Sequence, residues 1–266
     1  MTTLTSDTGS RSFPAGRGFG MLLSTEARVW ARDGATLFFS LVFPTVLLIG
    51  VGLAIPGMRD PIEDLPGIWE GKTPVALYVP VLMAVAFATP LLTVMPVTFG
   101  QYRERGVLRR LSTTPMRPQA IVLAHLVINL VAILAATVVM LVAGQLVFGL
   151  AAPLHLATVV LVFVLGVAAL YSLGMLIGAR VPRGSAASGI GSLLYFPMLF
   201  FAGVWTPGPT MPDTVAAIAR FTPLGAAAQA MTAGWFEEGF PTVEVLVLAA
   251  WTAVVLPLAI KLFRWS

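Results

Sequence analysis

Residues 102–118 read YRERGVLRRLSTTPMRP and form the densest cluster of charge in the sequence. The stretch holds five arginines, at positions 103, 105, 109, 110 and 117, against one carboxylate, Glu104. Residues 73–101 before it and 118–179 after it contain no Lys, Arg, Asp or Glu. A basic segment between two long apolar runs is typical of a loop on the cytoplasmic side of a membrane. The stretch therefore predicts a chain that crosses the bilayer on both sides of this loop.

The composition of the whole chain is that of a protein embedded in lipid. Of 266 residues, 58% are hydrophobic and 11% are charged, and the mean hydropathy is +0.91. Charged residues make up about 25% of ordinary soluble domains, so a soluble protein is excluded. The sequence contains no cysteine. This excludes a disulfide framework, a thiolate metal site and a cysteine nucleophile.

Apolar segments predict six transmembrane helices, since a helix needs about 20 apolar residues to cross a bilayer. The uncharged run after the basic stretch is too long for one crossing, so we divide it near 149–153. In the second span, three prolines predict a bent helix whose freed carbonyls need partners from neighbours. The fold class is all-α and polytopic. The predicted spans cover residues 35–58, 75–101, 119–148, 155–179, 186–205 and 242–262.

Shorter helices are predicted around these spans. Residues 19–33 place Phe19, Leu22, Leu23, Ala27 and Trp30 on one face and Glu26 elsewhere, as in an amphipathic helix in the membrane interface. Prolines break residues 206–240 into two helical pieces, 213–221 and 224–233, that lie on or dip into the outer leaflet. We expect residues 1–18 to be a disordered cytoplasmic tail and residues 19–266 to be a single transmembrane domain.

The distribution of basic residues predicts the orientation. With six spans and both termini in the cytoplasm, 13 of 16 basic residues are cytoplasmic, and the acidic segment 59–72 is outside. A seventh span within 206–240 would place Lys261 and Arg264 outside, against the positive-inside rule.

Motifs for catalysis or ion coupling are missing from the sequence. Gly71-Lys72-Thr73 lacks the glycine spacing of a phosphate-binding loop, and no H-E-x-x-H or G-x-S-x-G motif is present. The histidines, His125 and His155, have no carboxylate near them in sequence. We interpret both as packing or interfacial residues rather than a proton relay or metal pair. The chain is expected not to be an enzyme.

The basic stretch itself allows two interpretations. It is either a topological anchor that contacts lipid headgroups, or a short helix that offers leucines and arginines to an acidic groove on a soluble partner. The residues alone leave both open.

In sequence order, three stretches resemble the membrane subunit of a type-2 ABC exporter. Residues 21–49 resemble the interfacial helix and first span of that family. The run from Tyr102 to Leu111, with Thr114-Pro115 and Pro118 after it, resembles the Arg-Glu-x-Gly-x-Leu coupling segment. Phe196-Pro-Met-Leu-Phe-Phe-Ala-Gly-Val-Trp, Met211-Pro and Phe221-Thr-Pro-Leu-Gly resemble the fifth span and outer helices. The chain is more similar to the daunorubicin-resistance branch than to the polysaccharide branch.

The resemblance implies a permease of the bacterial cell membrane that exports a hydrophobic or amphipathic drug, antibiotic or lipid. It implies a pair of cytoplasmic ATPase subunits, which bind ATP and Mg²⁺, and a second six-span permease, identical or homologous; this chain would bind no cofactor, no metal and no nucleic acid. A polysaccharide or glycolipid permease and a non-transporting partner of an ATPase are the alternatives. The residues expected to couple to the ATPase are Arg103, Glu104, Arg105, Gly106, Leu108, Arg109 and Leu111.

Aromatic and small residues suggest where the cargo passes. Phe196, Phe200, Phe201 and Trp205 would line a mostly apolar path between two copies, formed by their second and fifth spans. The same rings could instead form an interfacial belt that faces lipid. The small residues Gly174, Gly178, Gly184 and Ser188 would allow close contact with neighbouring helices.

Overall fold

The chain folds into a helical bundle with six membrane-length segments. The computed structural model describes residues 15–63, 69–112, 119–207 and 210–263, and these residues contain helices but no strand. Six of the described helical segments are long and apolar enough to cross a membrane, which confirms the all-α polytopic prediction. They are Gly34–Ala54, Pro74–Glu104, Gln119–Phe148, Leu156–Arg180, Gly184–Phe201 and Thr242–Leu262.

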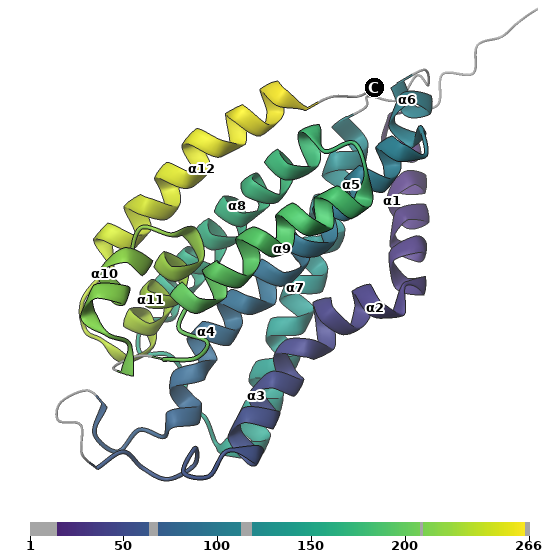
Figure 1. Ribbon diagram of the computed structural model, residues 1–266. Coiled ribbons are helices and arrows are strands. Elements are labelled where there is room, and N and C mark those ends of the chain that lie inside the picture. The colour runs from purple at the N-terminus through teal and green to yellow at the C-terminus, as the bar shows by residue number, and fades with distance from the viewer. Residues whose placement is uncertain (1–14, 64–68, 113–118, 208–209, 264–266) are drawn as a thin grey trace, which may run out of the picture.

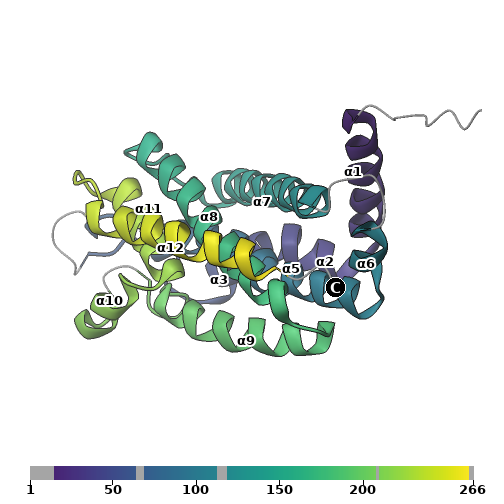
Figure 2. The ribbon, with the colours of Figure 1, turned by 90° about the horizontal axis from the view of Figure 1, so that it is seen from above.

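The two ends of the bundle differ in character. The C-terminal end of the described chain, the short helix α6 (Val107–Ser112) and the first helix α1 (Ala15–Arg32) lie at one end, which we call the basic end (Figure 1). The helices α10 (Asp213–Ala219) and α11 (Pro223–Phe236) lie at the opposite end. Turned by 90°, the bundle shows α1 running across the ends of the spans rather than along them (Figure 2).

Helix α1 is longer than predicted. It begins at Ala15, within the predicted tail, and the rest of that predicted disorder, residues 1–14, lies outside the described residues. Its Glu26 was predicted to lie away from the apolar face, and this is wrong. The Glu26 side chain is 12% exposed and faces the bundle beside His125.

The first span consists of α2 (Gly34–Leu37), the π-helical η1 (Phe38–Val42) and α3 (Phe43–Ala54). The side chain of Asp33 caps α2, because its Oδ1 accepts a hydrogen bond from the backbone nitrogen of Thr36 at 3.2 Å. The wide turn η1 ends two residues before Pro44, which cannot donate a backbone hydrogen bond. The span ends at Ala54, four residues before the predicted end.

The second span lies at the centre of the bundle. It consists of α4 (Pro74–Thr89), the π-helical η3 (Pro90–Val94) and α5 (Met95–Glu104), and almost all of α4 is buried. The hydroxyl of Thr89 donates to the carbonyl of Val85 at 2.9 Å, just before Pro90. This is an ordinary bond of a threonine hydroxyl to the carbonyl four residues earlier, whereas the carbonyl that Pro90 leaves free is that of Ala86. The expectation that neighbours supply partners for the freed carbonyls stays a prediction.

Glycines of the fourth and fifth spans pack on the π-helical turn of the second. A Cβ atom on Gly174 would lie 2.0 Å from the carbonyl oxygen of Leu91, and one on Gly191 would lie 2.3 Å from that of Leu92. These glycines belong to α8 (Leu156–Arg180) and α9 (Gly184–Phe201). Gly178 and Gly184 likewise contact the second span, at Phe99 and Gln101. The close contacts predicted for the glycines are therefore made within one chain, whereas Ser188 is exposed and stays a candidate for contact with another subunit.

The remaining spans follow the predicted boundaries closely. Both α7 (Gln119–Phe148) and α12 (Thr242–Leu262) match the predicted residues. Helix α9 ends at Phe201, and Gly203 then adopts a φ of 84°, a conformation that favours glycine. The fifth span was predicted to extend to Trp205, and this is wrong, because Trp205 lies beyond the end of the helix.

The two short helices at the opposite end have different environments. Most residues of α11 are buried, and it packs against α4, α8, α9 and α12, so it is inserted among the spans. Its many alanines permit this close packing. Thr222 caps the helix by accepting from the backbone nitrogen of Gly225 at 3.1 Å. In α10, by contrast, only Ala219 is buried.

Candidate functional site

The candidate site is the junction between α5 and α6 at the basic end. Helix α5 stops at Glu104, and Gly106 turns the chain with a φ of 68° before α6 begins at Val107. A positive φ is strained for residues with a side chain, so glycine is required for this sharp turn. The backbone nitrogen of Gly106 donates to the carbonyl of Arg103 at 3.0 Å, which closes the end of α5.

Arg103 ties this junction to the end of the fourth span. Its guanidinium donates to the carbonyl oxygens of Gly178 at 3.0 Å, Ala179 at 3.0 Å and Val181 at 2.5 Å. Gly178 and Ala179 lie in the last turn of α8 and Val181 directly follows the helix, where carbonyls lack a donor from the helix itself. A positive charge here also complements the helix dipole.

Glu104 makes the matching contact to the fifth span. Its carboxylate accepts a long hydrogen bond, 3.4 Å, from the backbone nitrogen of Gly184, at the first turn of α9. A negative charge is favoured at a helix N-terminus. Consecutive residues of α5 thus hold the two helix ends that flank the turn 181–183, so any displacement of the junction would act directly on spans four and five.

The exposed surface of the junction is formed by arginines. Arg105, Arg109 and Arg110 are exposed, whereas Leu108 is 1% exposed and packs into the core of the same chain. The expectation that leucines of this helix are offered to a partner is therefore wrong for Leu108. Leu111 lies in α6, but its side chain is outside the described part of the structure.

Sequence reasoning missed a polar cluster that connects α1 to this junction. The hydroxyl of Tyr102 donates to the carboxylate of Glu26, and Nε2 of His125 lies 3.3 Å from the same carboxylate oxygen. Burial disfavours the charged form of Glu26, but the contacts with His125 and Tyr102 outweigh it and lower its pKa. The cluster joins α1, α5 and α7 through residues far apart in sequence. His155 is exposed at the start of α8, so the two histidines do not form a pair.

The aromatic residues predicted to line a path are mostly exposed. The exposed fractions are 61% for Phe196, 45% for Phe200 and 60% for Trp205, and Phe201 is half-buried. Leu193, one turn before Phe196 on α9, is 73% exposed. The fifth span therefore presents a continuous apolar face that the described residues of this chain do not cover.

Near the basic end, a crevice separates the first and second spans. Its volume is about 200 Å³, and its walls include Phe39 of η1 and Thr93, Val97 and Gln101 of the second span. By contrast, α4 is buried inside its own chain. The predicted path along the whole second span is therefore corrected: only η3 and α5 can contribute to it.

These features define a multi-pass membrane protein. It has six membrane-length helices, a basic junction bound to two span ends, and an apolar face that the described residues leave uncovered. No described group of three or more His, Cys, Asp or Glu residues could hold a metal ion. The chain belongs to the ABC-2 type transporter family, whose membrane-domain model matches residues 17–236. It is thus the transmembrane subunit of an ABC transporter, a class of subunit that works with an ATPase partner and is generally not catalytic itself. A comparison with curated proteins gave no match.

Proposed function

We propose that the chain is the permease of an ATP-driven exporter that moves a hydrophobic or amphipathic compound out across the bacterial cell membrane. The observation that carries this proposal is the apolar face of α9 beside the crevice of the first and second spans. In the proposed assembly, a second permease, identical or homologous, faces this surface. Large aromatic side chains can contact varied apolar molecules without fixed polar geometry. A drug, an antibiotic or a lipid would fit such a path, as in the daunorubicin-resistance branch.

The coupling role is assigned to the junction of α5 and α6. The exposed arginines, Arg105 and Arg109, would contact an acidic groove on an ATPase that binds ATP and Mg²⁺. Arg103 and Glu104 would pass its motion to the ends of α8 and α9, because they bind the backbone there. Leu108 and Gly106 would hold the shape of the junction from inside this chain.

This assignment places the basic end and both termini in the cytoplasm. The native chain lacks cysteine, so single cysteines can be labelled without background. In intact cells, an impermeant maleimide should label Glu238→Cys and spare Ser185→Cys, since both residues are exposed but lie at opposite ends. Labelling of Ser185→Cys from outside would reverse the orientation.

Charge reversal tests the contact with the ATPase. Arg105→Glu combined with Arg109→Glu should leave insertion intact but abolish co-purification of the ATPase subunit. Arg28→Glu, at an exposed position of α1, is the matched control and should retain the ATPase. If the double variant retains both the ATPase and transport, the junction is only a topological anchor.

The proposed path is tested by cross-linking and by transport. Leu193→Cys should form a disulfide between two copies if α9 faces its counterpart, or a covalent pair with a homologous subunit carrying the equivalent cysteine. Phe200→Ala and Trp205→Ala should change the range of exported compounds while basal ATP hydrolysis persists. Unchanged export by both alanine variants would assign these rings to an interfacial belt.

A further inference from the structure

A second cavity lies at the end of the bundle opposite the basic junction. Its volume is about 440 Å³, within the range of small-molecule sites. Its walls come from the segment before α4, from α10 and α11, and from the start of α12. We call it the acidic pocket, because the ionisable side chains that line it are Arg220, Glu237 and Glu244.

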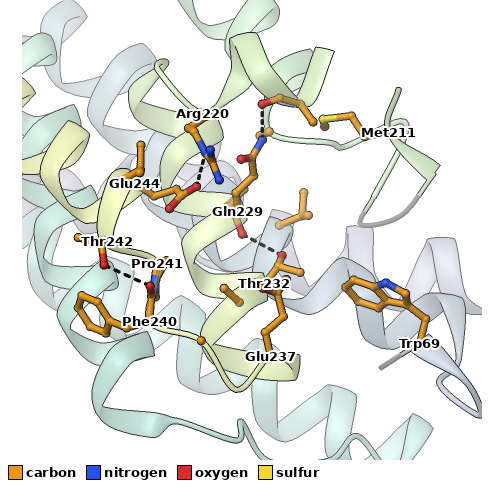
Figure 3. A pocket seen from close by; sticks show the side chains of 17 residues that line it. Trp69, Met211, Arg220, Gln229, Thr232, Glu237, Phe240, Pro241, Thr242 and Glu244 are labelled. Carbon is orange, nitrogen blue, oxygen red and sulfur yellow. Dashed lines mark hydrogen bonds and ion pairs between the residues drawn. The ribbon is translucent and has the colours of Figure 1, made fainter. Parts of the chain in front are cut away.

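An ion pair occupies one side of the acidic pocket. Nε of Arg220 donates to Oε1 of Glu244 at 2.6 Å, and the Glu244 side chain is only 8% exposed. Figure 3 shows these two residues on one side of the pocket and Glu237 with Trp69 on the other. The described lining therefore holds one cation and two carboxylates, which leaves the acidic pocket with an excess of negative charge.

Glu237 has no such partner. Among the described residues, none forms an ion pair or a hydrogen bond with its carboxylate, although the residue is partly buried. Burial, and then the negative charge of Glu244, raise the pKa of the Glu237 carboxyl. A bound cation would stabilise the charged form of Glu237 against both effects. It would take the place of the water lost on burial, and its positive charge would offset the repulsion from Glu244.

The other lining residues favour an organic cation over a metal ion. Trp69 presents an indole ring, which attracts cations and apolar groups, and its ring centroid lies 5.8 Å from that of Phe236, next to Glu237. Val81 and Ala228 provide apolar wall. The amide nitrogen of Gln229 donates to the carbonyl of Ala216 at 2.9 Å, which holds this polar side chain at the wall of the pocket (Figure 3).

We infer that the acidic pocket binds the protonated amine of an amphipathic molecule, with the ammonium at Glu237 and the apolar body against Trp69 and the alanines of α11. The site lies away from both the α5–α6 junction and the exposed face of α9, and its occupation does not depend on export. Two sources could supply the ammonium: a soluble amine, or the headgroup of phosphatidylethanolamine.

The probe for this site is dansylcadaverine, which joins a primary amine to an apolar fluorophore. Its N-acetylated form is the matched neutral control. The purified protein in phosphatidylcholine nanodiscs should bind the amine about ten-fold more tightly than the acetylated form, measured by dansyl fluorescence after subtraction of empty nanodiscs. Equal affinity for the two compounds would overturn the proposal, and this comparison requires no variant.

Variants then assign the binding to the pocket. Glu237→Gln should remove the preference for the amine, whereas Glu238→Gln, at the exposed neighbouring carboxylate, should retain it within about two-fold. A preference that survives Glu237→Gln in a protein with an unchanged thermal melt would refute the assignment.

The source of the ammonium is distinguished by the lipid. If phosphatidylethanolamine in the nanodisc weakens the binding of the probe to the wild-type protein but not its residual binding to Glu237→Gln, the headgroup is the ligand. If probe affinity is unchanged by this lipid, the site takes a soluble amine.

Discussion

The glycine contacts around η3 can be tested with two alanine substitutions on one helix. Gly191 faces the second span, where a Cβ would lie 2.3 Å from the carbonyl oxygen of Leu92, a backbone atom that cannot move alone. Gly189, two residues earlier, has nothing within 4 Å of the added Cβ. The two positions share a helix and a chemical change, so they differ only in available space.

The two substitutions should change the free energy of unfolding in opposite directions. Overpacking costs about 1–3 kcal/mol, and replacing glycine by alanine within a helix stabilises it by about 1 kcal/mol. Gly189→Ala should therefore raise the free energy of unfolding by up to about 1 kcal/mol, while Gly191→Ala should lower it by up to about 2 kcal/mol. The measurement is unfolding in mixed micelles with increasing dodecyl sulfate, followed by circular dichroism, with the oligomeric state checked by size exclusion.

The comparison of Gly189→Ala with Gly191→Ala also defines the result that would refute this reasoning. If both variants unfold within about 0.5 kcal/mol of each other, the helices do not meet at this distance. The role assigned to glycine in packing the second span would then be wrong.

Three further predictions concern charged groups. Arg103→Gln should lower the free energy of unfolding by about 2–4 kcal/mol in the same micelle assay, because it removes a charged donor from three carbonyls, while Arg105→Gln should have little effect. The lowered pKa of Glu26 means that its contribution to stability is present above its ordinary pKa of 4.5 and is lost as the pH falls through the lowered value; Glu26→Gln should abolish this dependence in pH-resolved melting. The pKa of Glu237, which faces Arg220 and Glu244 in the pocket, is raised, so its carboxylate gains a proton at a higher pH than an ordinary glutamate does. As the pH falls, dansylcadaverine should therefore lose affinity at a pH above the ordinary glutamate pKa, as a titration of binding against pH would show.

The spans could be predicted from the sequence because particular residue types mark where most of them begin and end. Charged or proline-containing breaks flank 119–148 and 242–262, and both helices match these bounds. The end of the fifth span was missed because Ala202 and Gly203 interrupt the helix within an apolar run, where hydropathy gives no signal.

Contacts between distant segments could not be predicted in the same way. Glu26 and His125 are separated by 99 positions, and helical periodicity alone assigns a carboxylate to the polar face. A weak signal was available, because a histidine inside an apolar span needs a polar partner somewhere. The inward packing of Leu108 was missed for the same reason: periodicity shows which residues share a face, but not whether the covering surface belongs to the same chain.

The π-helical turn η3 also makes the second span respond unevenly to the loss of a residue. A π-helical turn holds one residue more than an α-helical turn, so loss of one residue from Pro90–Val94 would convert η3 into an ordinary α-helical turn while α4 and α5 keep their relative rotation. The backbone against which Gly174 and Gly191 pack would then change, whereas the basic junction would keep its orientation. Loss of one residue between Met95 and Phe99, in α-helical sequence, would instead rotate the rest of α5 by about 100°, so buried Phe99 would leave the core and Arg103 would no longer point at the end of α8.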